Sequence, residues 1–219
     1  MDAACIGWAR MSEVIFFGVG AAIILDYEES CRRAGIAIAA AVKNRDGEVY
    51  FSQSGKVISP DRLDARLLGI PCLCPIFAPG QRLMAANEAQ ALGLKTSPAL
   101  IDPTATIAST STFGPGTYVD ARCIVAASCA IGAQVIVNRG ASIGHHCRTG
   151  DFVSIGPGVV VSGFVTIGER VLLGSGSVIA SRVRIGAGAV IGAGAVVIAD
   201  VAEGAVVAGN PARPLRRKA

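Results

Sequence analysis

Aromatic residues, histidines and net charge are all scarce in this sequence of 219 residues. Aromatic residues make up 5% of the chain, only two histidines occur, and the formal net charge is +4. A weak, evenly spread charge does not favour a nucleic-acid-binding protein. Two adjacent histidines, with no cysteines at zinc-ligand spacing, do not supply the three or four ligands of a zinc site. The sequence therefore predicts neither a metal site nor a nucleic-acid partner.

Long hydrophobic runs are also lacking. The best candidate is Val14 to Leu25, which is too short to span a bilayer and is interrupted by Gly18 and Gly20. We interpret it as a buried strand passing into a helix, and expect no membrane span. The residues before Met11 are expected to be an appendage to the fold, and Met11 is itself a possible start.

The seven cysteines form no CxxC pair. They are expected to be free thiols in a reducing compartment, which points to the cytoplasm. Three of them fall on positions that the repeat described next turns inward, and these are interpreted as core residues: Cys123, Cys129 and Cys147.

Small residues, in contrast, are abundant and regularly placed. From Ile101 to Val197 every sixth position is apolar, with Thr149 as the one exception among the seventeen. The residue after each of these positions is usually a glycine or another turn former, and the chain contains 27 glycines. A period of six fits neither an amphipathic helix nor an alternating strand. It is typical of a β-solenoid in which three hexads make one triangular coil, so equivalent corners recur at every third hexad.

The residues before the repeat predict a small α/β unit. The pattern indicates a strand at 14–17, a glycine loop at Gly18 and Gly20, a helix at 21–34 and a second strand at 36–42. A loop at a helix N-terminus can bind phosphate through its backbone amides, so both glycines are candidate substrate-binding residues. A dinucleotide fingerprint would need a third glycine where Ile23 stands, which disfavours NAD.

Further along, a short helix is expected near 59–61 and another helix at 81–92. The run 70–77 contains Pro71 and Pro75, and is interpreted as an edge strand or a strand with irregular ends. Residues 95–98 are expected to link two domains, 11–97 and 98–213. Past Asp200 the repeat is expected to be lost, with 209–212 closing the solenoid.

The two histidines, His145 and His146, fall at a predicted corner whose inward positions are taken by Ile143 and Cys147. An imidazole that points outward from a rigid corner is a candidate general base, although a solvated histidine pair is the plainer interpretation. Gly163 stands three hexads after His145, with no side chain to cover its amide, and a bare N–H beside a base suits a developing oxyanion. Asn138, one corner earlier, adds a polar side chain.

These residues resemble a known family. The segments Asn138-Arg-Gly-Ala-Ser-Ile-Gly-His-His-Cys, Gly163-Phe-Val-Thr-Ile-Gly-Glu, Gly174-Ser-Gly and Gly209-Asn-Pro-Ala-Arg are similar to the NeuD/PglD-type sugar acyltransferases. The resemblance implies a Rossmann-like first domain and a left-handed parallel β-helix. It also implies a homotrimer with sites between subunits, acetyl-CoA as co-substrate, and a nucleotide-linked sugar of bacterial surface-glycan synthesis as acceptor.

The resemblance further implies a role for each residue. His145 would be the catalytic base and Gly163 the amide that binds the thioester oxygen. Asn138 would lie in the active site, and the backbones of Ser175 and Ala193 would follow the pantetheine arm.

The sequence departs from the family pattern at three places. His146 replaces the acid that usually follows the catalytic histidine, and Ser154 stands where some members have a second histidine. In the glycine loop Ala22 replaces a histidine. Lys43 and Asn44 replace acids that contact the nucleotide base in some members. Two alternatives therefore stay open: a catalytically silent trimeric binding or assembly module, and a hexapeptide acyltransferase with a non-sugar acceptor.

Overall fold

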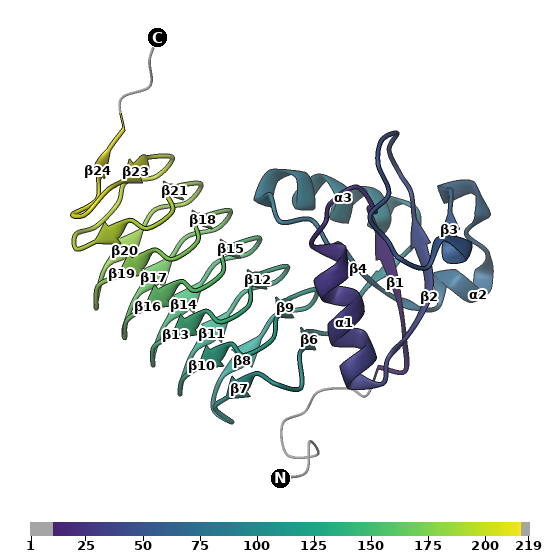
Figure 1. The fold of residues 1–219 in the computed structure, drawn as a ribbon, viewed down its shortest axis with the longest axis horizontal. Coiled ribbons are helices and arrows are strands. Elements are labelled where there is room, and N and C mark those ends of the chain that lie inside the picture. The colour runs from purple at the N-terminus through teal and green to yellow at the C-terminus, as the bar shows by residue number, and fades with distance from the viewer. Residues whose placement is uncertain (1–10, 216–219) are drawn as a thin grey trace.

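The computed structural model describes residues 11–215, and Figure 1 shows a small α/β unit beside a rod of stacked coils. The first unit is a five-stranded sheet in the order β3-β2-β1-β4-β5, in which every pairing is parallel. Its elements are β1 (Glu13–Phe17), α1 (Ile24–Ala34), β2 (Ala37–Val42), a 3-10 turn (Ser54–Lys56), β3 (Val57–Ile58), a 3-10 turn (Pro60–Arg62), α2 (Ala65–Leu68), β4 (Pro71–Leu73), α3 (Pro79–Ala91) and β5 (Lys95–Thr96).

Three predictions for this unit are corrected in detail. The helix predicted from 21 begins at Ile24, because residues 21–23 form turns. The strand β4 is not at an edge, since it pairs with both β1 and β5, and its prolines only shorten it to three residues. The expected linker begins with a strand, because Lys95 and Thr96 pair with β4.

The rod consists of short strands, two residues long up to β22, joined by tight corners and arranged as three faces whose pairings are parallel up to β23. One, the six-stranded face, contains β7 (Thr106–Ile107), β10 (Ile124–Val125), β13 (Ser142–Ile143), β16 (Val160–Val161), β19 (Val178–Ile179) and β22 (Val196–Val197). The five-stranded face contains β8 (Thr112–Phe113), β11 (Ala130–Ile131), β14 (Arg148–Thr149), β17 (Thr166–Ile167) and β20 (Arg184–Ile185). The eight-stranded face contains β6 (Leu100–Ile101), β9 (Tyr118–Val119), β12 (Ile136–Val137), β15 (Ser154–Ile155), β18 (Leu172–Leu173), β21 (Val190–Ile191), β23 (Val206–Ala208) and β24 (Arg213–Pro214).

The strand register confirms that three hexads make one coil. Ile143 pairs with Val161, which pairs with Ile179, and Val137 pairs with Ile155. The apolar position of each hexad and the small residue four places later fill the interior together, and Cys123, Cys129 and Cys147 are buried as predicted. The prism is therefore held by a continuous apolar column under parallel ladders.

The end of the rod differs from the prediction. The repeat is shortened rather than lost after Asp200, because Val201 bridges to Ile185 and Val207 pairs with Ile191. Each of these pairings spans less of the chain than the three hexads of a regular coil. The strand β24 then pairs antiparallel with β23 and covers its free edge.

The first unit covers the early coils of the eight-stranded face. Tyr118 and Ile136, which point outward from that face, are fully buried in one cluster with Phe16 and Tyr27 of the first unit. The rings of Tyr27 and Tyr118 stack with centroids 3.8 Å apart.

Candidate functional site

The His edge is the line of corners between the six-stranded and five-stranded faces, at residues 144–146, 162–164 and 180–182. Both histidines of the chain lie on it and both are exposed. The Nδ1 atoms of His145 and His146 are 3.0 Å apart, a hydrogen bond between the two rings. His145 therefore keeps its Nε2 atom available to solvent or to a substrate.

Gly163 lies directly against the imidazole of His145. A Cβ atom at Gly163 would come within 2.9 Å of both Cε1 and Nε2 of that ring, closer than real contacts allow. Its N–H donates to no other residue of the part of the chain that the structure describes, whereas the next amide, Phe164 N–H, donates to the carbonyl of His145 at 2.9 Å. An unpaired amide and an unpaired imidazole nitrogen thus meet on one exposed edge, as the three-hexad step predicts.

The Asn edge is the line of corners between the eight-stranded and six-stranded faces, at residues 138–140, 156–158, 174–176 and 192–194. It carries Asn138, Ser175 and Ala193. Asn138 is nearly buried, and its Oδ1 accepts a hydrogen bond from the backbone N–H of Arg139 at 2.8 Å. Ser175 and Ala193 are exposed, and their N–H groups donate to no described residue.

Asn138 and His145 consequently lie on different edges of the same rod. Asn138 and Ser175 line a shallow groove beside the start of α1, together with Ile23, Asp26 and Arg139. Arg139 pairs with Asp26 at 3.3 Å. Burial and the nearby Asp120 carboxylate raise the pKa of Asp26, and Arg139 and Arg33 oppose that shift. One chain alone does not bring the asparagine to the imidazole.

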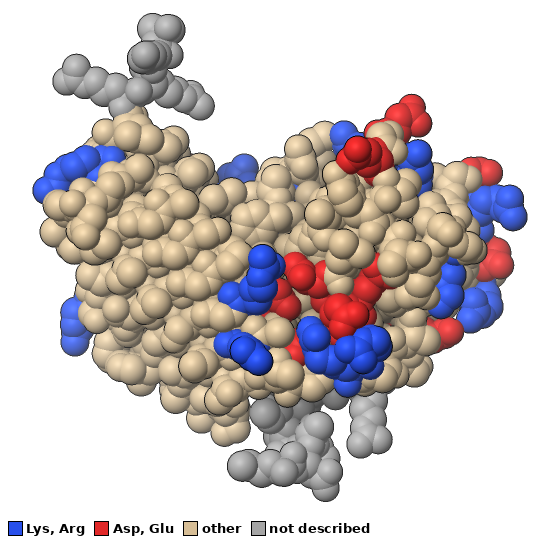
Figure 2. Space-filling view, viewed as in Figure 1, with Lys and Arg blue, Asp and Glu red and all other residues tan. Residues whose placement is uncertain are grey.

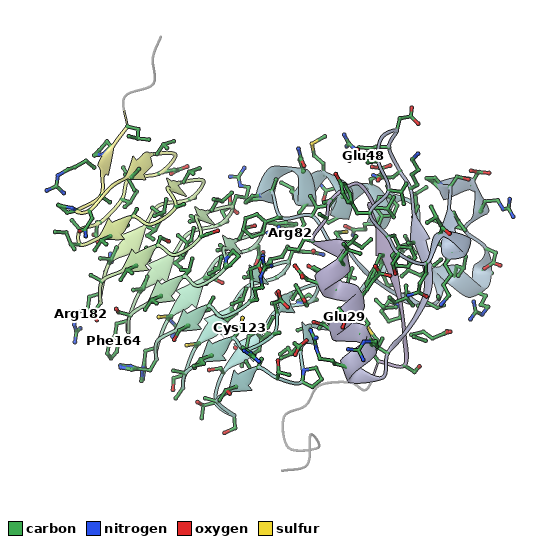
Figure 3. The ribbon with its side chains drawn as sticks, viewed as in Figure 1. Glu29, Glu48, Arg82, Cys123, Phe164 and Arg182 are labelled. Carbon is green, nitrogen blue, oxygen red and sulfur yellow. The ribbon has the colours of Figure 1, made fainter. Side chains whose placement is uncertain are left out.

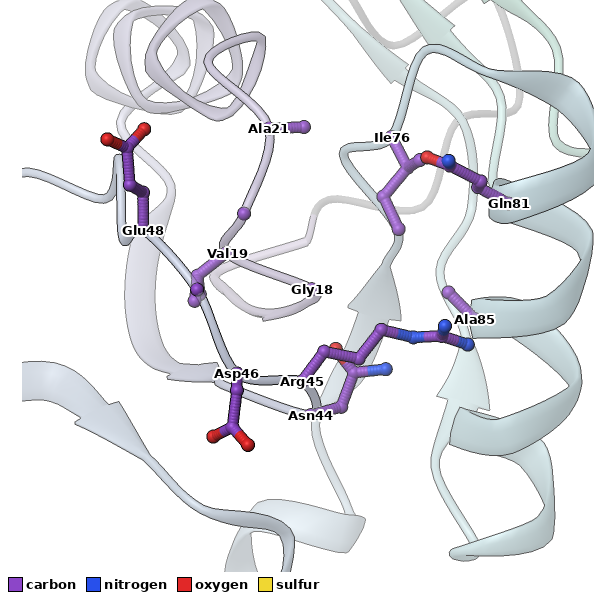
Figure 4. A pocket seen from close by; sticks show the side chains of 12 residues that line it. Gly18, Val19, Ala21, Asn44, Arg45, Asp46, Glu48, Ile76, Gln81 and Ala85 are labelled. Atoms are coloured by element: carbon purple, nitrogen blue, oxygen red, sulfur yellow. The ribbon is translucent and has the colours of Figure 1, made fainter.

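Gly18 and Gly20 lie in a separate pocket of the first unit, shown in Figure 4. Gly18 has φ +93°, and its N–H donates to the carbonyl of Val42 at 3.0 Å. The pocket also contains Asn44, Arg45 and Gln81. Asn44 donates from Nδ2 to Glu88 at 2.8 Å, which leaves its amide oxygen as an acceptor.

Ser154 does not lie in any of these openings. It is fully buried, donates to the carbonyl of Phe77, and accepts from the guanidinium of Arg82 at 2.9 Å. Arg82 is itself buried and has no carboxylate partner among residues 11–215. Sequence reasoning missed Arg82, and no local pattern marks it, because its partners on the rod are far away along the chain.

The described residues can also be considered for metal ligands, membrane-spanning helices and clusters of charge. No group of three or more His, Cys, Asp or Glu residues within the described range could hold a metal ion, and none of the helices there has the length and apolar character of a membrane span. Figure 2 shows charged side chains gathered where α1 meets the first coils, while most of the visible surface of the rod is uncharged.

Comparisons with known proteins identify the family of the chain. The family described as "Bacterial transferase hexapeptide (six repeats)" matches residues 146–181 and 164–199. The acetyltransferase domain of PglB from Neisseria gonorrhoeae, solved with acetyl coenzyme A, is 30% identical at a TM-score of 0.82, with 94% of this chain and 100% of that chain covered. The chain belongs to the hexapeptide-repeat sugar acyltransferases.

Two further structures extend the likeness. A mutant of perosamine N-acetyltransferase from Caulobacter crescentus, in complex with CoA and GDP-perosamine, is 28% identical at a TM-score of 0.82, covering 95% of this chain and 98% of that one. WeeI from Acinetobacter baumannii is 22% identical at a TM-score of 0.76, covering 94% and 100%, and shows the fold alone. No curated protein matches the sequence. The predicted fold class, a small parallel α/β domain followed by a left-handed parallel β-helix, is confirmed.

Proposed function

We propose that this acyltransferase moves the acetyl group of acetyl-CoA to an amino or hydroxyl group of a nucleotide-linked sugar in surface-glycan synthesis. The observation that carries the proposal is the contact of Gly163 with the imidazole of His145 on an exposed edge. Relatives solved with acetyl coenzyme A, or with CoA and GDP-perosamine, support the choice of donor and acceptor. An amine is the favoured nucleophile because perosamine N-acetyltransferase acylates nitrogen.

The chemistry is a direct transfer. The amine attacks the thioester carbon while Nε2 of His145 takes a proton from the amine. The C–N bond forms, and the C–S bond to coenzyme A breaks. The oxygen becomes negative in the tetrahedral intermediate, where the free N–H of Gly163 would stabilise it, and coenzyme A would leave as a thiol with the proton that His145 took. A thioester on a cysteine of the rod is disfavoured, because Cys129 and Cys147 below the His edge are at most 2% exposed.

A second copy of the chain completes the site in this proposal. The six-stranded face joins the Asn edge to the His edge and presents a row of exposed apolar side chains to solvent: Ile124, Val160 and Val178. Burying that row against a neighbour brings the Asn edge of one subunit to the His edge of the next. We infer a homotrimer, with the unpaired N–H groups of Ser175 and Ala193 donating to the pantetheine arm.

The two parts of the chain would have different roles. Residues 11–97 would bind the nucleotide in the pocket at Gly18 and Gly20, and residues 98–213 would carry the transfer. We place the reaction in the cytoplasm, where acetyl-CoA is formed and where thiols stay reduced.

Thiol release from acetyl-CoA, measured with a panel of nucleotide-linked amino sugars, tests the proposal. Wild-type protein should release thiol with at least one acceptor, and His145→Ala should lower kcat by about a hundredfold or more. Release that stays at background with every acceptor, and that His145→Ala leaves unchanged, would instead support a silent binding module.

A further inference from the structure

Three large side chains form a column on the His edge, one from each of three successive coils. His146, Phe164 and Arg182 occupy the same left-handed corner position, with φ of 59°, 62° and 67°. The ring of Phe164 stacks on His146 with centroids 4.8 Å apart and planes 20° apart. The guanidinium carbon of Arg182 lies 4.8 Å from the centroid of Phe164. Figure 3 shows Phe164 and Arg182 together at the rim of the rod, away from the first unit.

The corner itself does not require these side chains. Ser128 occupies the same position one coil before His146, with φ of 61°. Phe164 is 42% exposed, so it contributes little to the interior. Left-handed corners recur elsewhere on the rod, for example at Arg122 and Arg170, so the backbone conformation is not what distinguishes this edge. The distinguishing feature is the mutual stacking beside His145.

The column fixes the ring of His146. Phe164 stacks on the face of His146 and meets the ring of His145 edge-on, at 5.0 Å and 89°. This arrangement holds the two Nδ1 atoms 3.0 Å apart. We propose that Phe164 and Arg182 are positioning residues that hold His146 as the acceptor of the His145 Nδ1–H, which leaves Nε2 of His145 unprotonated beside Gly163.

The positive charge of Arg182 favours His145 over His146 as the imidazole that carries a positive charge. Two imidazoles that meet nitrogen to nitrogen share one proton, and either ring can hold it. When Nε2 of His145 takes a proton from the sugar substrate, His145 becomes an imidazolium with two N–H groups. His146 must then offer a lone pair to the Nδ1–H of His145. A guanidinium on the far side of Phe164 disfavours a further positive charge on His146, so the charge stays on His145. The other titratable groups beside the pair are the thiols of Cys129 and Cys147.

Nitrogen NMR tests the positioning without any substrate. The chain has only two histidines, so protein labelled with ¹⁵N-histidine gives four ring signals, assigned with His146→Gln. With both rings neutral, His145 should carry its proton on Nδ1 and His146 on Nε2. Phe164→Ala should give mixed tautomers of His145, Phe164→Tyr should keep the wild-type pattern, and Arg170→Gln is the matched control on another edge. A pattern in Phe164→Ala identical to wild type would overturn the proposal.

The kinetic part rests on the proposed transferase function. Phe164→Ala should lower kcat about tenfold with the KM for acetyl-CoA within about twofold, and Phe164→Tyr should restore it. Arg182→Gln should lower kcat with the KM for acetyl-CoA within about twofold, because the positive charge can then pass to His146, and Arg182→Lys should keep the wild-type kcat. Equal losses in Phe164→Ala and Phe164→Tyr would contradict positioning by the ring. Wild-type protein without activity would refute the transferase function and leave the NMR test intact. Should Phe164→Ala fail to fold by circular dichroism, Phe164→Leu takes its place.

Discussion

At the scale of single residues, Gly163 and Gly144 of the His edge are expected to respond differently to one added methyl group. The three atoms nearest to a Cβ at Gly163 would all belong to the ring of His145, whereas a Cβ at Gly144 would lie 2.7 Å from backbone atoms of Ser162 and Gly163. A ring can turn aside, but the backbone of a stacked coil cannot. The two substitutions therefore separate the role of the site from the needs of the fold.

We predict that Gly163→Ala folds but lowers kcat about tenfold or more, because the displaced imidazole and the covered amide no longer face one reacting atom. Gly144→Ala should destabilise the protein by about 2 kcal/mol or more, because a close-packed coil must shift. Urea unfolding and initial rates check both, with Gly55→Ala as control, since a Cβ there meets nothing within 4 Å. Full activity in Gly163→Ala would contradict the proposed site.

At the scale of elements, a buried carboxylate ties α1 to the first coil. Asp102 accepts hydrogen bonds from Ser30 at 2.6 Å and from Thr104 at 2.6 Å, and pairs with Arg33 at 2.8 Å. Burial acts to raise the pKa of Asp102, but these hydrogen bonds outweigh it and hold the pKa below its usual value. A carboxyl group whose folded pKa is depressed stabilises the protein above its unfolded pKa and loses that stabilisation as the pH falls.

Asp102→Asn should therefore destabilise the protein at pH 7 by about 2 kcal/mol, because Arg33 loses its charged partner. The difference from wild type should begin to shrink below about pH 4, where the unfolded carboxyl group takes up a proton, and should be lost only at lower pH, where the folded one does so too. Urea unfolding at pH 7 and pH 3 measures this. A difference of the same size at both pH values would show that charge is not what Asp102 contributes.

A second contact between the first unit and the rod is made by Arg82, which joins α3 to the rod. Its guanidinium donates to the carbonyls of Ile76 and Phe77 on one side and of Gln134, Phe152 and Val153 on the other. Burial lowers the pKa of Arg82 to about 10, so the group stays charged at neutral pH. We predict that Arg82→Met costs about 3 kcal/mol in urea unfolding, because several buried carbonyls lose their donors, and that it exposes α3 to proteolysis. Arg66→Met, at an exposed ion pair, is the control.

These elements also show what a sequence can reveal. The step of three hexads that joins His145 to Gly163 follows from a period of six, because a local repeat fixes where each residue lies in the stack. The partners of Arg82 and Asp102 belong to no repeat, so nothing local indicates them. The shortened coil at Val201 and the short strand β5 were missed for a similar reason, since pairing with a neighbour decides both rather than residue preference.

At the scale of the whole molecule, the separation of His145 from Asn138 leads us to predict that activity depends on association of subunits. The apolar row on the six-stranded face offers the contact, so a charge placed there should separate the subunits. Val160→Lys is expected to give a smaller species by light scattering and to lose activity in parallel. Thr166→Lys, at an exposed position on the five-stranded face, should change neither.

Mixing two inactive variants gives the sharper test of a shared site. A chain with His145→Ala still offers Asn138, and a chain with Asn138→Ala still offers His145. If each site takes the asparagine from one subunit and the imidazole from the next, random assembly of equal amounts leaves about a quarter of the sites with both side chains intact. Co-refolded variants should therefore recover about a quarter of wild-type kcat per chain, while each variant alone and the two mixed without unfolding should recover none. If co-refolding restores nothing although mixed oligomers form, both side chains must come from one subunit, and the arrangement of edges inferred here would be wrong.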